Sequence, residues 1–301
     1  MKHLITTILC LFALTCLSPL HAEERVWTSS DGKKLKAELI SYDLEANQVV
    51  IKNKRGKEYT LPLERLSEED RNFLKELDQE KKEKAAENAK IIAERAGKTF
   101  TEKTDAGNTF HVYYPKSYTS EKKPPMLILF SPGGGGKGIM NNFKQGADSL
   151  GWVVVGCDKL KNGQNWGEGK TIFNDLLPVI EERVDHDPEL LYMGGFSGGG
   201  LRALLYSAEY DKPWKGIISC GGWLGGSKNY DKDYRKYMAV AMVNGDTDAG
   251  ANSYAEADKD ILKKRRCKVE IFNFKGGHTI GSPELIEEAM TWVQENTKTE
   301  K

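Results

Sequence analysis

The sequence predicts an α/β protein with an eight-stranded, mostly parallel sheet, preceded by a small β-barrel domain and a helical linker. Short apolar runs alternate with amphipathic segments along the second half of the chain. Continuous runs of Val, Ile and Leu are typical of parallel strands that are buried on both faces. Before residue 78, by contrast, short segments alternate between apolar and polar residues, as in half-buried antiparallel strands.

Eight segments account for the predicted sheet. The first two, "TFTEKT" and "TFHVYY", flank the turn "DAGN" and predict a hairpin. The six apolar runs that follow are Met126–Phe130, Trp152–Cys157, Leu190–Gly195, Gly216–Cys220, Met238–Val243 and Val269–Phe274. Helical segments between them predict that most of these strands run parallel. The resulting domain spans residues 99–297.

Charge and composition narrow the classes of function. The chain has 301 residues, and its 44 Lys and Arg balance its 44 Asp and Glu. A nucleic-acid partner is not expected, because phosphate binding needs a clustered excess of positive charge. Residues 1–22 combine a weakly basic start, an apolar core and a small residue, Ala22, which predicts a cleaved signal peptide. We therefore expect a secreted or periplasmic bacterial protein with no membrane span after cleavage.

Three cysteines remain after the predicted cleavage, namely Cys157, Cys220 and Cys267. An odd number argues against a disulfide framework, so we expect buried thiols. No pair of histidines has the spacing of metal ligands, and the sequence predicts neither a metal nor an organic cofactor.

The first domain, residues 24–77, contains "RVWTSSDGKKLKAELISYD" and "NQVVIKNKRGKEYTLPL", two strand-turn-strand patterns. Ser67 begins a helix, with Asp70 placed as in a capping box. This unit resembles the SHD1-like domain, an SH3-like barrel that occurs as an accessory module in secreted bacterial proteins. The resemblance implies a peptide or protein ligand, and a spacer or stabilising cap is the alternative. Residues 78–98, rich in Lys, Glu and Ala, predict a solvated helical linker.

One short motif points to catalysis. Gly195-Phe196-Ser197-Gly198-Gly199 fits the pattern G-x-S-x-G, between a predicted strand and a predicted helix. In that setting the serine occupies a turn so tight that flanking side chains would collide with the strand or the helix. The hydroxyl of Ser197 would then project at the carboxyl edge of the sheet. The alternative is a glycine-rich turn with an inert serine.

A serine nucleophile needs a base and an orienting acid. His111 lies on a predicted strand and His186 precedes the strand that leads to Ser197, so neither reaches the carboxyl edge. His278, in the loop "KGGHTIGSP" after the last strand, does. Asp248 follows the seventh strand and is our choice for the acid, with Asp246 as the alternative.

The order Ser, Asp, His resembles that of α/β-hydrolases, over about residues 100–297. The resemblance implies an oxyanion hole made by the amide of Gly198 and one amide of "FSPGGGGKG", for which we choose Gly134. A phosphate-binding loop is the alternative, but Gly138 stands where a P-loop requires Ser or Thr.

These residues predict a serine ester hydrolase that forms an acyl-enzyme. Only a short polar segment follows the sixth strand, so we expect an open site, with Trp223 at the substrate. The domain is similar to feruloyl esterases, acetyl-xylan esterases and polyhydroxybutyrate depolymerases, which implies esters on polysaccharides or other bulky substrates. The alternatives are a peptidase of the same fold and a secreted binding protein whose hydrolase scaffold is inactive.

Overall fold

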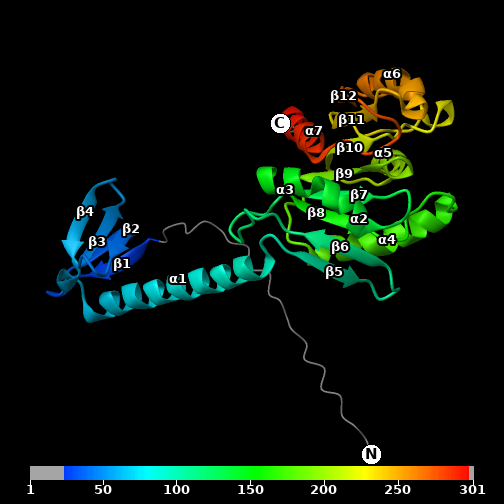
Figure 1. The fold of residues 1–301 in the computed structure, drawn as a ribbon. Helices are drawn as coiled ribbons and strands as arrows, with labels where there is room; N and C mark the ends of the chain where they lie inside the picture. The colour runs from blue at the N-terminus through cyan, green and yellow to red at the C-terminus, as the bar shows by residue number, and fades with distance from the viewer. Residues whose placement is uncertain (1–23, 298–301) are drawn as a thin grey trace, which may run out of the picture. The chain divides into compact units, whose positions relative to one another are not determined.

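The structure, a computed structural model, describes residues 24–297 (Figure 1). The predicted signal peptide lies outside the described residues. The chain divides into two compact units, with the boundary between Ala86 and Glu87. No helix within the described range is both long and apolar enough to cross a bilayer.

The first unit contains a four-stranded antiparallel sheet with the order β1-β2-β3-β4. Its strands are β1 (Arg25–Thr28), β2 (Lys34–Asp43), β3 (Gln48–Asn53) and β4 (Glu58–Pro62). A small core of Trp27, Val49, Ile51 and Leu74 is almost fully buried beneath it. Apart from a bridge between Ser29 and Leu66, these strands pair only in this open order, and the predicted barrel stays a prediction.

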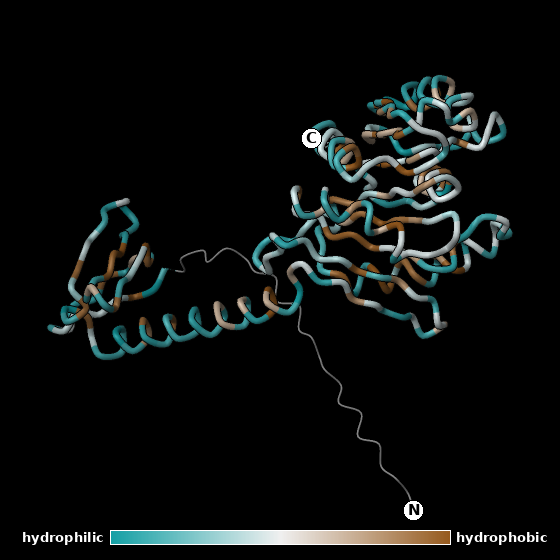
Figure 2. The backbone as a smooth tube through the Cα atoms, in the orientation of Figure 1, coloured by the Kyte–Doolittle hydropathy of each residue, from teal (hydrophilic) through white to brown (hydrophobic). Residues whose placement is uncertain are grey.

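Helix α1 (Glu68–Arg95) is continuous over 28 residues, so the predicted linker is not a separate helix. The Asp70 amide donates to the Ser67 hydroxyl (3.2 Å), which forms one half of the predicted capping box. The Asp70 carboxylate instead accepts from the Thr28 amide (2.6 Å) and pairs with Arg25 (2.7 Å). These contacts tie the start of the helix to β1. Most of the remaining helix surface is hydrophilic (Figure 2).

The second unit contains the predicted eight-stranded sheet, in the order β12-β11-β10-β9-β7-β8-β6-β5. The neighbouring strands from β12 to β8 are parallel, whereas β5 and β6 form an antiparallel hairpin at the edge. The strands are β5 (Thr99–Lys103), β6 (Thr109–Tyr113), β7 (Met126–Phe130), β8 (Val153–Cys157), β9 (Leu191–Phe196), β10 (Trp214–Cys220), β11 (Ala239–Gly245) and β12 (Lys268–Phe274). The sheet prediction is confirmed.

Helices cover both faces of this sheet (Figure 1). One face packs against α4 (Trp166–Arg183), α5 (Gly198–Glu209) and α6 (Ala249–Lys264). The other packs against α2 (Gly136–Met140), α3 (Lys144–Leu150) and α7 (Pro283–Asn296). Every residue of β7, β8 and β11 is buried, which explains their unbroken apolar sequences.

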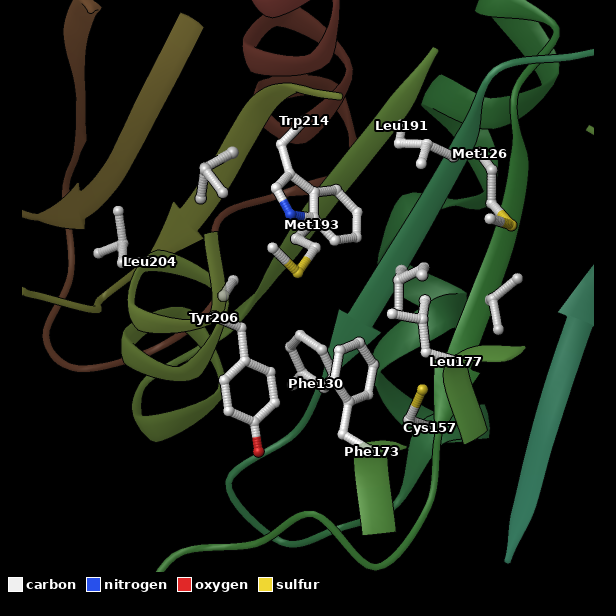
Figure 3. Packing of buried hydrophobic residues seen from close by; sticks show 14 of the residues in the cluster. Met126, Phe130, Cys157, Phe173, Leu177, Leu191, Met193, Leu204, Tyr206 and Trp214 are labelled. Atoms are coloured by element: carbon white, nitrogen blue, oxygen red, sulfur yellow. The ribbon is translucent and has the colours of Figure 1, made fainter. Parts of the chain in front are cut away.

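Aromatic side chains hold α5, the helix that follows Ser197, against the sheet. Phe130, the last residue of β7, makes edge contacts with Phe173 of α4 (5.3 Å between centroids) and Tyr206 of α5 (5.6 Å), as Figure 3 shows. All three side chains are fully buried. Burying each contributes about 2 kcal/mol, and the edge-to-face geometry adds to this. The turn between β9 and α5 is thereby held against the end of β7.

Cys157, Cys220 and Cys267, the cysteines of residues 24–297, are buried free thiols. Cys157 ends β8 and Cys220 ends β10, and β7 and β9 lie between these two strands. Three inter-strand spacings of about 4.8 Å exceed the reach of a disulfide. Burial raises the pKa of the Cys267 thiol to about 11, so it stays protonated at neutral pH.

Candidate active site

Ser197 lies in a strained turn between β9 and α5. Its backbone has φ 55° and ψ −123°, a region that is rarely populated by residues other than glycine. A Cβ atom on Gly195 would lie 2.3 Å from the carbonyl oxygen of Phe130, and one on Gly199 would lie 2.0 Å from it. The Ser197 amide donates to the Cys220 carbonyl (2.8 Å). Both motif glycines are therefore required by close backbone contact, and the turn is anchored to β7 and β10.

The structure brings Ser197, His278 and Asp248 into one hydrogen-bonded line. His278 Nε2 lies 2.8 Å from Ser197 Oγ, and His278 Nδ1 lies 2.7 Å from Asp248 Oδ2. The three residues follow β9, β12 and β11, so they meet at the carboxyl edge of the sheet. The His278 side chain is 44% exposed, whereas that of Asp248 is 3% exposed. A buried carboxylate behind an accessible imidazole is the arrangement that orients a general base.

Neighbouring backbone fixes this geometry. Asp248 is the N-cap of α6, and its second oxygen, Oδ1, accepts from the Ala251 amide (3.1 Å). Gly221 has a left-handed φ of 56°, and a Cβ there would lie 3.2 Å from the imidazole and 3.3 Å from Asp248 Oδ2. The ring of Phe196 lies 5.0 Å from the imidazole centroid. Phe196 and Gly221 therefore both lie next to the His278 imidazole. The sequence did not predict this, because Phe196 occupies a variable position of the motif and Gly221 belongs to an ordinary Gly-Gly pair.

Asp246, the alternative acid, occupies a different place. Its Oδ1 accepts from the Gly276 amide (3.0 Å), and its own amide donates to the Phe274 carbonyl (2.8 Å). The Thr247 amide and hydroxyl both donate to the Gly276 carbonyl. Asp246 therefore holds the loop that carries His278 and does not contact the imidazole.

The structure changes one oxyanion assignment. The amide of Gly198, at the first position of α5, has no hydrogen-bond partner among residues 24–297, so it is free to act as the predicted oxyanion donor. The Gly134 amide, however, donates to the Ser131 carbonyl (3.0 Å) within a turn. Its neighbour Gly133 reaches only the Ser131 hydroxyl, at 3.4 Å. Gly133 is therefore the better candidate for the second amide, because its hydrogen bond to Ser131 is longer and weaker than that of Gly134.

Trp223, the predicted substrate-binding residue, lies on the loop after β10, two residues beyond Gly221. Its ring stacks on Tyr254 of α6, with 6.0 Å between centroids and 14° between planes. Tyr254 is 40% exposed, so the pair presents an aromatic surface to solvent. The next residue, Leu224, donates its amide to the buried Asp258 carboxylate (2.7 Å). This bond fixes the loop to the helix that Asp248 caps.

The other two histidines within the described residues serve elsewhere. His111 Nε2 lies 3.1 Å from Asp158, and its Nδ1 lies 2.9 Å from the Thr101 hydroxyl. His186 Nδ1 lies 2.7 Å from the Val184 carbonyl, in the segment before β9. Residues 24–297 contain no cluster of three or more His, Cys, Asp or Glu side chains placed to hold a metal ion.

Comparison with known proteins identifies the fold. No family model and no curated protein matches the sequence. Among solved structures, a thermostable esterase from Pseudomonas putida matches with a TM-score of 0.55 and 13% identity, over 67% of this chain and 83% of that one. A hyperthermophilic esterase from the archaeon Pyrobaculum calidifontis matches with a TM-score of 0.53 and 13% identity, over 73% and 93%. Est1E from Butyrivibrio proteoclasticus matches with a TM-score of 0.52 and 16% identity, over 66% and 98%. The second unit has the α/β-hydrolase fold.

Proposed function

We propose that the protein is a serine hydrolase that cleaves carboxylic esters. The observation that carries the proposal is the line from Ser197 Oγ through His278 to Asp248, with contacts of 2.8 and 2.7 Å. A serine hydroxyl is a weak nucleophile until an adjacent base accepts its proton, and the imidazole is placed to do so. The esterases that share the fold make ester hydrolysis the favoured reaction of this site.

The reaction proceeds in two halves. Ser197 Oγ bonds to the ester carbonyl carbon as His278 Nε2 takes its proton, and the carbonyl electron pair moves onto oxygen. The amides of Gly198 and Gly133 bind that oxyanion. When the pair returns, the alkoxide leaves as an alcohol with the proton from His278. Water then repeats the sequence on the acyl-enzyme and releases the carboxylic acid, while Asp248 stabilises the imidazolium each time.

The surroundings of the site favour a bulky substrate. His278 is accessible, and the segment after Trp223 folds into only a short 3-10 helix, Ser227–Asn229. The stacked Trp223 and Tyr254 rings form an exposed aromatic surface on the loop after β10 and on α6, the helix that Asp248 caps. We propose acyl groups on polysaccharides or other polymeric alcohols as the substrate class, because an open site accepts them without a lid.

The remaining proposals concern where the protein acts. The predicted signal peptide supports export to the periplasm or beyond, where polymeric substrates occur. For the first unit we propose a peptide or protein ligand, in line with its resemblance to SHD1-like modules. This ligand would act as a targeting contact and would play no part in the chemistry.

The test is hydrolysis of p-nitrophenyl acetate and butyrate by residues 23–301, beside Ser197→Ala. We expect the substitution to lower kcat about 10⁴-fold or more, because it removes the nucleophile. Ser30→Ala, an exposed serine in the first unit, is the matched control and should leave kcat unchanged. A folded wild-type protein without activity on any ester of the series would contradict the proposal and favour a binding protein with an inactive scaffold.

A further inference from the structure

The loop after β8, residues 158–165, approaches Gly198, the residue after Ser197, and takes no part in the hydrogen bonds that join Ser197, His278 and Asp248. The Asn162 amide donates to the Pro132 carbonyl (2.9 Å) of the glycine-rich loop. The preceding residue is Lys161, whose carbonyl accepts from Arg202 of α5 (3.2 Å). Lys161 also forms an isolated antiparallel β-bridge with Gly133. The backbone at Asn162 is therefore anchored both to the candidate oxyanion loop and to the helix that follows Ser197.

This anchoring places the Asn162 side chain on Gly198. A Cβ atom built on Gly198 would lie only 1.8 Å from Asn162 Oδ1 and 3.1 Å from Nδ2. With a Cα–Cβ bond of about 1.5 Å, the amide end of Asn162 lies within ~3.3 Å of the Gly198 Cα. The motif G-x-S-x-G leaves this position free, yet here the missing side chain is what makes room for Asn162.

Asn162 has the chemistry of an oxyanion ligand. Its side chain is exposed and has no hydrogen-bond partner within residues 24–297. An asparagine amide offers two N–H donors, and its χ2 torsion is broad and roughly two-fold. A half-turn about this torsion therefore brings Nδ2 to the position of Oδ1 without moving the loop. The donor then stands beside Gly198, whose own amide is the first oxyanion donor.

We propose that Asn162 Nδ2 donates a third hydrogen bond to the oxyanion, together with the amides of Gly198 and Gly133. The proposal rests on the proposed function, since the charge that Asn162 would bind forms only when Ser197 attacks a carbonyl. Asn162 adds no new step to the reaction. It stabilises the oxygen that carries the displaced electron pair in both halves of the reaction, so it acts on kcat rather than on ground-state binding.

The test compares Asn162→Ala and Asn162→Asp with the wild-type protein in p-nitrophenyl acetate hydrolysis. Removal of one oxyanion donor costs about 100- to 1,000-fold in buried sites, so for this exposed donor we expect Ala to lower kcat about 10- to 100-fold. KM should stay within about threefold. The isosteric carboxylate of Asp should lower kcat further than Ala at pH 7, because it has no donor and repels the oxyanion. Asn72→Ala, which removes an exposed asparagine from the first unit, should leave kcat unchanged.

A second variant separates donation from space filling. Gly198→Ala keeps the backbone amide but puts a methyl group where the Asn162 amide lies, and so displaces it. We expect Gly198→Ala to lower kcat in the wild-type background. In the Asn162→Ala background the same substitution should lower kcat by less than about threefold, because both changes remove the same interaction. Equal kcat in all Asn162 variants would overturn the proposal, as would full activity of Asn162→Asp beside an impaired Asn162→Ala.

The proposal and the proposed function fail in different ways. An active wild-type protein with unaffected Asn162 variants refutes only the role of Asn162. If the wild-type protein hydrolyses no ester, the rate at which a fluorophosphonate labels Ser197 replaces kcat, because its phosphoryl oxygen occupies the same hole. A tenfold slower labelling of Asn162→Ala would then support the proposal. A wild-type protein that is neither active nor labelled has no oxyanion to bind, which refutes both.

Discussion

Asp246 and Asp248, the two aspartates after β11, give the sharpest test of the hydrogen-bonded line from Ser197 through His278 to Asp248. Asp248→Asn preserves the shape of the side chain but leaves one oxygen where the structure uses two. Asp248 Oδ1 accepts from the Ala251 amide (3.1 Å) and Oδ2 lies 2.7 Å from His278 Nδ1. If the asparagine oxygen keeps the helix cap, its NH₂ group faces Nδ1. The imidazole must then carry its proton on Nε2, toward Ser197, and it can no longer accept the serine proton.

This wrong tautomer sets the expected magnitude. The corresponding substitution in a serine protease lowers kcat about 10⁴-fold, and we expect a loss of the same order here. At 1.36 kcal/mol for each factor of ten, this is roughly 5 kcal/mol of transition-state stabilisation. Asp246→Asn is the matched control. Asp246 Oδ1 accepts from the Gly276 amide (3.0 Å), and an asparagine oxygen can accept the same bond without the charge, so we expect less than a tenfold loss.

The assay is kcat and KM for p-nitrophenyl acetate, with thermal unfolding of each variant as the check on folding. Asp248→Asn should retain KM within about threefold, because the carboxylate is buried behind the imidazole. A folded Asp248→Asn with more than a tenth of wild-type kcat would refute the reasoning. A larger loss in Asp246→Asn than in Asp248→Asn would make Asp246 the acid.

Three further predictions concern packing, pH and substrate. Gly199→Ala places a Cβ 2.0 Å from the Phe130 carbonyl, so we expect at least about 3 kcal/mol lower stability in urea unfolding, whereas Gly138→Ala, with open space around it, should change little. Burial raises the pKa of the Asp258 carboxyl above its usual 3.8, so the folded chain binds that proton more tightly than the unfolded chain does. Stability should therefore fall as the pH rises from 4 through the raised value, and Asp258→Asn should lack this component; a constant Tm difference from pH 4 to 8 would count against it. Trp223→Ala should raise KM for acylated polysaccharides more than for p-nitrophenyl acetate, and equal effects on both would exclude Trp223 from polymer binding.

The sequence predicts which residues meet in the line Ser197–His278–Asp248, because the topology of the sheet leaves few candidates. Ser197 follows one parallel strand, and only His278 among the histidines of the predicted domain follows another at the same edge. Spacing alone could not choose between Asp246 and Asp248, since both lie in one loop. The choice depends on the first turn of α6, where the Ala251 amide draws Asp248 inward. Hydrogen bonds of this kind are decided by backbone torsions that a sequence pattern does not specify.

The oxyanion side of the site is less predictable, because its donors lie on irregular loops. Four consecutive glycines give no local signal for which amide points at the nucleophile. The turn bond that engages Gly134 depends on the torsions of the whole segment. Asn162 comes from a third loop, and its path is set by contacts with Pro132 and Arg202, which are distant in sequence. Its one sequence signal is its place just after a buried parallel strand, where ligand-binding loops of such sheets lie.

This division suggests how substrate preference can change without loss of the chemistry. Ser197, His278 and Asp248, the proposed nucleophile, base and acid, follow β9, β12 and β11, and backbone contacts that tolerate little substitution, such as that between Gly199 and Phe130, hold the turn at Ser197. The groups that would touch the acyl group or the alcohol follow β7, β8 and β10, on loops anchored at a few points. Changes within these three loops that keep those anchors should therefore alter KM and substrate choice. Changes at the strained turn around Ser197 should instead remove activity toward every ester alike.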